Sequence, residues 1–293
     1  MKPGRLDVGV VGAGRVGAVL GAALRIAEHR VVAASGVSEG SRTRIETLLP
    51  GTPQRDAEAV VRSADLVLLT APDDALASLV AGLAGVGAWR PGQIAVHASG
   101  RFGLDPLRPA MDVGVTGIAA HPAMTFTGTS VDLARLREAA FAVTASAPVL
   151  PIAQALVVEM GGEPVVVDEA DRALYHAAVV HGANHVVALV SQAMSLLRDV
   201  GIADPAALLG PLVRASIDGA LSEAPGAATT LTGPVVRADV GTIAAHLDAL
   251  GGRTDARATY VALARATARY ARDSGRIDEA QYAGVMDVLE DRS

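Results

Sequence analysis

The first half of the chain alternates short apolar runs with amphipathic segments. Apolar runs bounded by turn residues predict strands, and helical spacing of apolar residues predicts helices between most of them. Strands are expected near residues 6–11, 30–35, 65–70, 93–97, 115–120, 140–144 and 163–167, with a further helix near 149–160. Because strands that alternate with helices form βαβ units, we predict a doubly wound, mostly parallel α/β sheet of the Rossmann type.

The pattern changes after Asp168. Strand signals cease there, and Ala-, Leu- and Val-rich segments with helical spacing follow near residues 169–200, 204–222, 239–251, 254–274 and 278–290. Turn-forming stretches separate these segments: "GIADP", "EAPGAATTLTGP" and "GGRTD". We therefore predict a Rossmann-like dinucleotide-binding domain over residues 1–168 and an all-helical domain over residues 169–293 for substrate and dimer contacts.

Composition narrows the chemistry. The 293 residues contain no cysteine, which excludes disulfides, thiolate nucleophiles and cysteine-ligated zinc and fits a reducing, cytoplasmic location. Lys2 is the only lysine in the sequence, so a lysine base or Schiff base is excluded as well. The net charge is −6 and no cluster of basic residues occurs, so neither nucleic acid nor an anionic membrane surface is an expected partner.

Two apolar stretches were compared with targeting and membrane segments. The N-terminal "MKPGRLDVGVVGAG" lacks the basic, apolar, small-residue order of a signal peptide. Residues 177–197 approach the length of a membrane span, but His181, Asn184, His185 and Gln192 would be costly in lipid. We expect no targeting segment, and we interpret residues 177–197 as a buried helix of a soluble protein.

The stretch "VGVVGAGRVGAVLGAAL" places Gly12, Gly14 and Gly17 in the spacing G-x-G-x-x-G between a strand and a helix. Gly12 permits a tight turn, Gly14 lets the backbone approach a pyrophosphate, and Gly17 permits close packing of helix on strand. The helix N-terminus, at Arg15 and Val16, supplies oriented N–H groups to the phosphates. The alternative is a glycine-rich turn with no ligand.

The end of the second strand indicates which dinucleotide binds. An NAD-binding protein offers a carboxylate there to the ribose 2′-hydroxyl, but the sequence "VVAASGVSEGSRTR" has no acidic residue at the strand end. Ser35, Arg42 and Arg44 could instead hold a 2′-phosphate, which favours NADP as the cofactor. The alternative is that both arginines only solvate the start of a helix, with Glu39 nearby.

Residues directly after the strands of a doubly wound sheet face the ligand. In "TAPDDA", which follows the third strand, Ala71 and Pro72 would line the nicotinamide half of the cofactor. Asp73 and Asp74 would serve as N-cap residues of the next helix.

Two histidines also follow strands. "HASG" offers His97, Ser99 and Gly100, and "HPAMTF" offers His121. Each histidine either touches ligand or is a core residue with satisfied hydrogen bonds. His121 is the better candidate for a ligand contact.

The stretch "VVHGANHVV" places two histidines and an asparagine in an apolar helix. At 100° per residue, His181 lies about 60° from Asn184 and shares its face. His181 and His185 have the i, i+4 spacing of a metal-binding pair, but Gly182 stands where a zinc protease has glutamate, and no third ligand is near. A metal site, a catalytic face and a core helix are the alternatives, and we favour catalysis. His176 could border the same cleft or stabilise the helix.

A further stretch, "LTGPVVRADVGTIAAHL", combines a Thr-Gly-Pro break with polar residues. It predicts the start of a helix with Asp239 as the N-cap. Arg237 is the type of residue that holds a substrate carboxylate, whereas we expect His246 to pack against a helix surface or a subunit partner.

With these motifs the chain resembles a family of bacterial proteins described as oxidoreductases, in which a Rossmann-like domain precedes a helical C-terminal domain of unknown function. The resemblance covers nearly the whole chain through "GAGRVG", "TAPDDA", "HASG", "HPAMTF", "YHAAVVHGANH" and "LTGPVVRADVGTIAAHL". The chain is more remotely similar to 6-phosphogluconate and β-hydroxyacid dehydrogenases, pyrroline-carboxylate reductase and ketopantoate reductase. In several of these a catalytic lysine lies four residues before an asparagine. Asn184 matches the asparagine, but Val180 stands at the lysine position.

The resemblance implies an NADP-linked oxidoreductase that transfers hydride between nicotinamide and a small keto or hydroxy acid. Some family members look like alternative ketopantoate reductases, which makes ketopantoate the expected substrate. Without a lysine, we expect His181 or His121 to donate the proton near neutrality, and Asn184 to bind the carbonyl. Arg237 and Ser99 would orient the carboxylate. By analogy we expect a homodimer. Rival interpretations are an imine reductase related to pyrroline-carboxylate reductase and a non-catalytic protein that senses NADPH.

Overall fold

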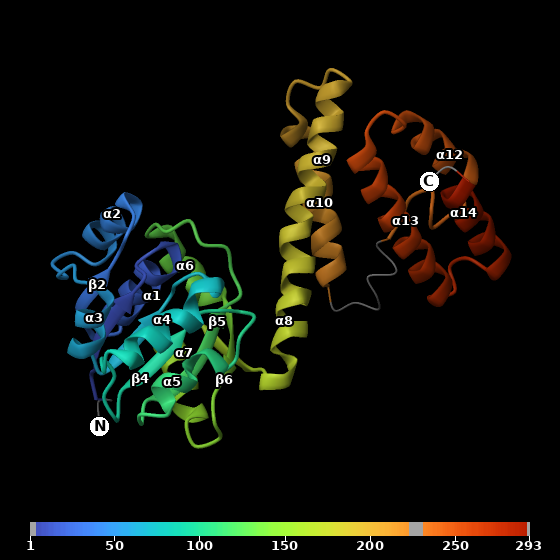
Figure 1. Ribbon diagram of the computed structural model, residues 1–293. Coiled ribbons are helices and arrows are strands. Elements are labelled where there is room, and N and C mark those ends of the chain that lie inside the picture. The colour runs from blue at the N-terminus through green and yellow to red at the C-terminus, as the bar shows by residue number, and fades with distance from the viewer. Residues whose placement is uncertain (1–3, 223–230, 292–293) are drawn as a thin grey trace. The chain divides into compact units, whose positions relative to one another are not determined.

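The computed structural model describes residues 4–222 and 231–291, and the chain divides by its contacts into two compact units, Met1–Val180 and His181–Ser293 (Figure 1). The sequence predicts a boundary between residues 168 and 169. The helix after this point contributes to the first unit because Arg172 is buried and donates hydrogen bonds to the carbonyl oxygens of Ala119 and Ala142. The predicted break "EAPGAATTLTGP" lies mostly outside the described residues.

A seven-stranded sheet forms the centre of the first unit. Its strands are β1 (Asp7–Val11), β2 (Arg30–Ser35), β3 (Leu66–Leu69), β4 (Ile94–His97), β5 (Thr116–Pro122), β6 (Ala140–Thr144) and β7 (Glu163–Val166). Their order is β2-β1-β3-β4-β5-β6-β7; β1 to β5 pair in parallel, β6 pairs antiparallel with β5, and β7 pairs in parallel with β6. The seven predicted strands and the mostly parallel α/β fold are confirmed.

Helices cover both faces of this sheet. They are α1 (Arg15–Ile26), α2 (Glu39–Leu48), α3 (Ala57–Ser63), α4 (Asp73–Gly85), α5 (Arg108–Met111), α6 (Val131–Arg135) and α7 (Leu150–Glu159). Alternate residues of β3 point to opposite layers: Leu66 and Leu68 belong to the core shared with α1 and α7, whereas Val67 and Leu69 belong to the core shared with α3 and α4. Each such buried side chain contributes about 1.5–3 kcal/mol. The apolar run "LVLL" therefore suits a strand that is buried on both faces.

The direction of chain winding reverses at β1. The chain passes from β1 to β2 on one side and then crosses to β3 on the other side of β1. Ligands of doubly wound sheets bind outside the carboxyl ends of the strands at such a switch point. The loops that follow β1 to β4 are therefore the first place to examine for a site.

The second unit is built of helices. From α8 (Arg172–Val179) the chain continues through a π-helical turn (Val180–Asn184) into α9 (His185–Asp199), followed by α10 (Pro205–Leu221), α12 (Val240–Ala249), α13 (Thr254–Asp273) and α14 (Glu279–Asp291). Residues 181–222 and 231–291 contain no strand, which confirms the predicted all-helical domain. Its core includes Val235, Ile243, Leu247, Val261, Ala264, Ala268, Val285 and Leu289. Asp239 is the N-cap of α12, as predicted, and its Oδ1 accepts the Thr242 N–H at 3.0 Å.

The helices α9 and α10 expose apolar side chains. The helical segment Glu169–Asp199 is long and apolar enough to cross a membrane by length and composition, with a mean hydropathy of 1.3, yet none of its most apolar window is buried. The expectation of a buried helix here is therefore wrong for the single chain. In α10, Leu208, Leu212 and Leu221 are all exposed. Apolar faces of this kind are normally covered by a partner.

Candidate functional site

The glycine-rich loop connects β1 to α1 at the switch point. Gly12 has a φ of +88°, which favours glycine, and the Gly14 N–H donates to the Gly12 carbonyl oxygen at 2.6 Å to close a tight turn. A Cβ on Gly14 would meet only the Gly12 carbonyl oxygen, at 3.9 Å, so a ligand can approach the backbone there. Helix α1 begins at Arg15 without an acidic residue in its first turn, so its N-terminus suits an anion.

The neighbouring strands hold this loop in place. The Thr70 hydroxyl, after β3, donates to the Gly12 carbonyl oxygen at 2.7 Å. A Cβ on Gly17 would overlap the Thr70 hydroxyl and lie 2.6 Å from the Gly12 carbonyl oxygen, so only glycine lets α1 approach β3 this closely. At the end of β2, the Ser35 hydroxyl accepts a hydrogen bond from the Gly12 N–H at 3.1 Å. The backbone carbonyl oxygen of Ser35 accepts one from the Ala13 N–H at 2.7 Å. Ser35 and Thr70 therefore support the loop from two sides.

A groove of about 640 Å³ lies along the loop. The predicted cofactor residues that line it are Gly12, Gly14, Val16, Ser35, Ala71 and Pro72, and the predicted substrate residue Ser99 lines it as well. Gly17 is buried, while Arg15 and Arg42 are exposed and lie outside the groove lining. Sequence reasoning missed Val11, Gly36, Val37, Ser38, Ser41, Ala57, Thr70, Asp73, Leu79 and Ala98. The hydroxyl-rich "SGVSEGS" after β2 was the available signal for Ser38 and Ser41.

Three arginines near the groove have no carboxylate partner among residues 4–222 and 231–291. Across the described part of the chain, Arg15, Arg42 and Arg44 form no ion pair. A Cβ on Gly128 would lie 2.7 Å from Arg15 Cγ and 2.5 Å from Arg44 Nε, so both side chains pack against the same loop. The buried Asp132 carboxylate orders that loop by accepting the Gly128 N–H at 2.7 Å. Guanidinium groups without partners suit a phosphate.

The predicted caps of α4 need a correction. Pro72 occupies the N-cap position with an extended ψ of 149°, so the helix starts one residue earlier than a cap at Asp73 would allow. Asp73 and Asp74 lie in the first turn and make no side-chain cap hydrogen bond. Their carboxylates still favour the helix N-terminus through its positive end charge.

A buried histidine and an exposed carboxylate fix the loop that follows β4. His97 is fully buried, and the Ser99 N–H donates to its Nδ1 at 3.2 Å; the proton is therefore on Nε2, which donates to the Gly103 carbonyl oxygen at 2.6 Å. Burial lowers the pKa of His97 to about 4. The Glu169 carboxylate accepts the Leu104 N–H at 2.8 Å. Of the two alternatives for His97, the structure shows the core residue.

His121, on β5, lies in a cluster with α8. Its Nδ1 is 2.9 Å from the Tyr175 hydroxyl oxygen, and its ring lies edge-on to that of His176 with the centroids 5.9 Å apart. Gly100 makes room for these rings, since a Cβ there would lie 2.6 Å from His176 Cδ2 and 3.0 Å from His121 Nε2. Because Gly100 follows Ser99, His121 lies against the loop at the end of the groove.

The surroundings keep His121 uncharged. Burial, and after it the neighbouring His176 and Arg172, lower its pKa to about 4. His121 therefore lacks the ordinary pKa near 6.5 on which the expected proton donation near neutrality depends. A neutral imidazole can nevertheless donate one ring N–H to a carbonyl oxygen.

Arg172 carries a buried positive charge whose hydrogen-bond acceptors in the described residues are all neutral. Its side chain is 1% exposed and donates to the Thr144 hydroxyl at 2.7 Å and to the carbonyl oxygens of Ala119 and Ala142 at 3.1 and 3.0 Å. Its Nη1 has no hydrogen-bond partner in the described residues. Burial lowers the pKa of Arg172. A guanidinium that meets only neutral acceptors costs free energy, so this region favours negative charge.

The remaining predicted site residues, His181, Asn184 and Arg237, belong to the second unit. The helix is π-helical at Val180–Asn184, so the assumed 100° per residue does not hold there, and His181 contacts His185 with their Nδ1 atoms 3.2 Å apart. The side chains of all four of these residues are exposed. No group of three or more His, Cys, Asp or Glu side chains suited to a metal occurs within residues 4–222 and 231–291.

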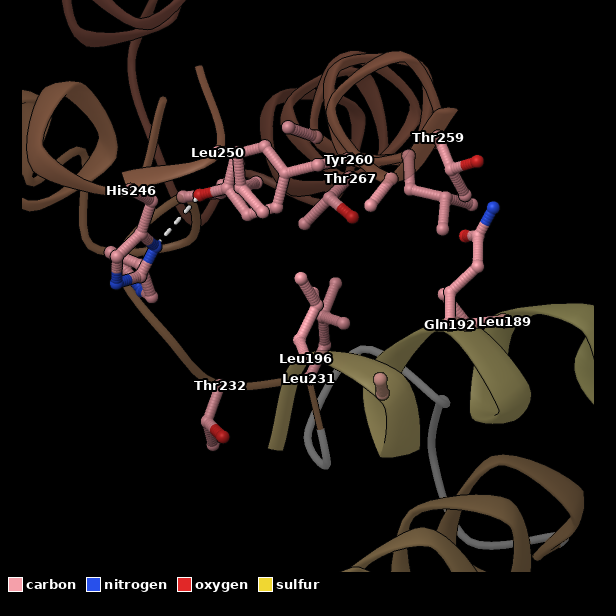
Figure 2. A pocket seen from close by; sticks show the side chains of 16 residues that line it. Leu189, Gln192, Leu196, Leu231, Thr232, His246, Leu250, Thr259, Tyr260 and Thr267 are labelled. Atoms are coloured by element: carbon pink, nitrogen blue, oxygen red, sulfur yellow. Dashed lines mark hydrogen bonds between the residues drawn. The ribbon is translucent and has the colours of Figure 1, made fainter. Parts of the chain in front are cut away.

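A second cavity, of about 360 Å³, lies within the second unit and is lined by α9, α12, α13 and residues 231–235 (Figure 2). Its wall is mostly aliphatic, and Figure 2 shows His246 bonded to Tyr260, with 3.0 Å between Nδ1 and the hydroxyl oxygen. None of the predicted site residues lines this cavity. His246 packs on a neighbouring helix, which is one of the two expectations for it. Without a charged side chain to orient a polar substrate, this cavity is the weaker candidate.

Family models match both parts of the chain. Residues 1–122 match a Rossmann-like domain, and residues 139–267 match a domain of unknown function, DUF2520. The chain joins a Rossmann-like domain to a DUF2520 domain. This confirms the resemblance that the motifs indicate. The DUF2520 match begins at β6, so the matched region includes the end of the sheet together with the helices.

Solved structures share the fold of the whole chain. A candidate NADP oxidoreductase from Bacteroides fragilis has 22% identity over 90% of this chain and 98% of its own, with a TM-score of 0.75. An imine reductase from Pseudomonas sp. has 16% identity, covers 97% of this chain and 100% of its own, and has a TM-score of 0.61. Pyrroline carboxylate reductase from Plasmodium falciparum, with NADP bound, has 13% identity, covers 99% and 98%, and has a TM-score of 0.56. No curated protein matches the chain.

Acid should destabilise the first unit through its buried histidines. Because the pKa values of His97 and His121 are about 4, the folded protein binds fewer protons than the unfolded chain between pH 4 and about 6.5. The contribution of each neutral histidine to the free energy of unfolding is therefore fully present above about pH 6.5. It is lost as the pH falls toward 4, by up to roughly 3 kcal/mol per histidine. Urea unfolding at several pH values should show a shallower fall for His97→Gln than for His185→Gln, which changes an exposed imidazole. Equal slopes would contradict this account.

Proposed function

We propose that the protein is a cytoplasmic NADP(H)-dependent oxidoreductase that transfers a hydride between nicotinamide and a small keto or hydroxy acid, with ketopantoate as the first substrate to test. The proposal depends above all on the continuity of the groove from the glycine turn at Gly12 to Ser99. His121 lies just beyond Ser99, against Gly100, and its Nδ1 is within hydrogen-bonding distance of the Tyr175 hydroxyl. A dinucleotide along this groove would bring its reactive ring toward side chains that can hydrogen-bond a carbonyl oxygen.

The residues present fit the cofactor. The N-terminus of α1 and the open backbone at Gly14 suit a pyrophosphate. Ser38 and Ser41 line the groove after β2, and with Arg42 and Arg44 they offer hydroxyl and guanidinium donors to a ribose 2′-phosphate. This donor set, with no carboxylate at the end of β2, supports NADP over NAD.

Residues of the first unit would then hold the nicotinamide, the reacting carbonyl group and the substrate carboxylate. Ala71 and Pro72 would flank the nicotinamide, which supplies the hydride when it is bound. The neutral imidazole of His121 would hydrogen-bond the carbonyl oxygen and stabilise the developing negative charge. Ser99, which is buried and lines the groove, would orient the substrate carboxylate. The roles proposed for the three site residues of the second unit stay predictions.

Two structural neighbours favour a second candidate function. The Pseudomonas imine reductase and the Plasmodium pyrroline carboxylate reductase share the fold over nearly the whole chain. An imine carbon accepts hydride in the same way as a carbonyl carbon, so the groove could serve either substrate class. The panel of substrates below distinguishes them.

The wild-type protein should bind NADPH more tightly than NADH and oxidise NADPH with a keto acid. Titration with each nucleotide, followed by absorbance at the nicotinamide band with ketopantoate, related keto acids and cyclic imines, measures both properties. Oxidation with cyclic imines alone would favour the imine reductase. Tight binding without consumption of NADPH by any substrate would indicate a sensing protein and contradict the proposal.

Replacing both Arg42 and Arg44 by Ala should weaken NADPH binding by roughly 10–100-fold, because a hydrogen bond to a charged group contributes about 1.5–3 kcal/mol. NADH lacks the 2′-phosphate, so its affinity should not change. Fluorescence titration with both nucleotides measures the difference. Arg137→Ala removes another exposed arginine of the first unit and serves as the control. An equal loss for both nucleotides would rule out the 2′-phosphate contact.

We also propose that the protein is a homodimer and that it binds neither nucleic acid nor membrane. The exposed apolar face of α10 supports an interface between two copies of the chain. Light scattering of the wild type should give twice the chain mass of 29.7 kDa. Leu212→Glu should shift the protein toward the monomer, because a carboxylate would be buried in the interface. Val113→Glu, at an exposed position of the first unit, should leave the mass unchanged. A monomeric wild type at micromolar concentration would exclude the dimer.

A further inference from the structure

One turn of α8 brings a buried charge, a phenol and two imidazoles together. Arg172 and Tyr175 are three residues apart, so they are neighbours on the helix surface. Tyr175 bonds His121 across to β5, and His176 lies against the same imidazole. Neither Tyr175 nor Arg172 lines the cofactor groove, and no sequence motif predicts a role for either residue.

The hydrogen bond between Tyr175 and His121 has a defined direction. His121 is neutral near pH 7 because its pKa is about 4, so only one of its ring nitrogens carries a proton. The Tyr175 hydroxyl has no other partner in the described residues, and a half-buried phenol proton needs an acceptor. The phenol therefore donates to Nδ1, and the imidazole proton is on Nε2. This Nε2 faces Gly100 at the end of the groove, where a Cβ on the glycine would lie 3.0 Å from it.

Arg172 supplies the charge that would stabilise the ionised phenol. Its guanidinium has only neutral hydrogen-bond acceptors, and its Nη1 has none in the described residues. Burial raises the pKa of Tyr175, and Arg172 opposes that rise. A phenolate at position 175 would add to the partial compensation that the nearby Glu169 carboxylate gives this buried positive charge.

We propose, on the basis of the oxidoreductase function proposed above, that Tyr175 is the proton source for the reaction and that His121 relays its proton to the substrate. When the hydride adds to the carbonyl carbon, the π electrons move to the oxygen, which takes the proton from His121 Nε2 and becomes a hydroxyl. At the same time Nδ1 takes the phenol proton, so the imidazole stays neutral and Tyr175 becomes a phenolate beside Arg172. The Nδ1 proton then returns to the phenolate while Nε2 takes one proton from solvent, so that the phenol and the starting imidazole tautomer are both restored. Oxidation of the alcohol runs through the same steps in reverse.

The relay explains how a chain without a catalytic lysine can protonate an alkoxide. Neutral His121 alone would have to become an imidazolate, which is far too basic, whereas the coupled transfer ends on a phenol. The other charged groups that act on the pair are His176 on α8, and Asp73 and His97 on the sheet side, and the Glu169 carboxylate acts on Arg172. His121 is the catalytic residue in this scheme, and Tyr175 is a positioning residue that acts through it.

Replacing Tyr175 by Phe tests the relay in the full-length protein. The variant keeps the ring and removes the proton source, so kcat for reduction should fall by roughly 10²–10⁴-fold while the Kd for NADPH stays unchanged. The wild-type kcat should be flat between about pH 6 and 9, whereas the kcat of Tyr175→Phe should fall about tenfold per pH unit, because its proton must come from solvent. Tyr260→Phe removes the same kind of Tyr–His bond, to His246, from the second unit and should leave kcat unchanged. A Tyr175→Phe profile parallel to the wild type, with lower thermal stability alone, would overturn the relay.

Nitrogen NMR of the free protein separates this proposal from the proposed function. The relay requires the His121 proton on Nε2, and ¹⁵N shifts report this without any substrate. A proton on Nδ1 in a protein that reduces keto acids would overturn the relay and leave the proposed function intact. A proton on Nε2 in a protein that consumes no NADPH would overturn the proposed function and, with it, the catalytic use of the relay.

Discussion

The close approach of α1 to the end of β3 is the constraint on which the nucleotide site depends. A side chain at Gly17 would collide with Thr70 and with the Gly12 carbonyl oxygen, so α1 can approach the end of β3 this closely only with glycine at this position. The positive φ of Gly12 then turns the chain, and the hydroxyls of Ser35 and Thr70 hold the turn between two strands. As a result, the α1 N-terminus points at the groove with an electrostatic preference for anions and without a mobile loop between them.

A different constraint shapes the other end of the groove. The antiparallel pairing of β5 and β6 leaves carbonyl oxygens of both strands within reach of one side chain, and Arg172 takes those of Ala119 and Ala142. Burial, then the neighbouring His176 and then this buried charge keep His121 neutral. The groove therefore runs from a part that suits phosphates to a part that favours a developing oxyanion, and both properties come from the first unit.

The strands, the helices and the glycine turn were predictable from the sequence because they depend on residues close together in the chain. The apolar runs of the seven strands and the periodic Ala, Leu and Val of the later helices are explained by burial on one or two faces of each element. The glycine spacing between a strand and a helix allows one main interpretation. Distant pairs were not predictable: Thr70 contacts Gly12 across 58 residues, and Tyr175 contacts His121 across 54. A threonine after a strand and a tyrosine in a helix carry no signal of such partners.

The sequence by itself determined the fold class, the two kinds of domain, the place of the glycine turn and the absence of cysteine and of any lysine after Lys2, since each depends on residue type and spacing along the chain. Only the tertiary structure decided which histidine is a core residue and which lies at the groove. His97 and His121 both lie at the ends of strands. Both ring nitrogens of His97 are hydrogen-bonded to the backbone, whereas His121 contacts the Tyr175 hydroxyl and lies near the buried Arg172. Burial and partners set the protonation of an imidazole, and both come from segments that only the folded chain brings together.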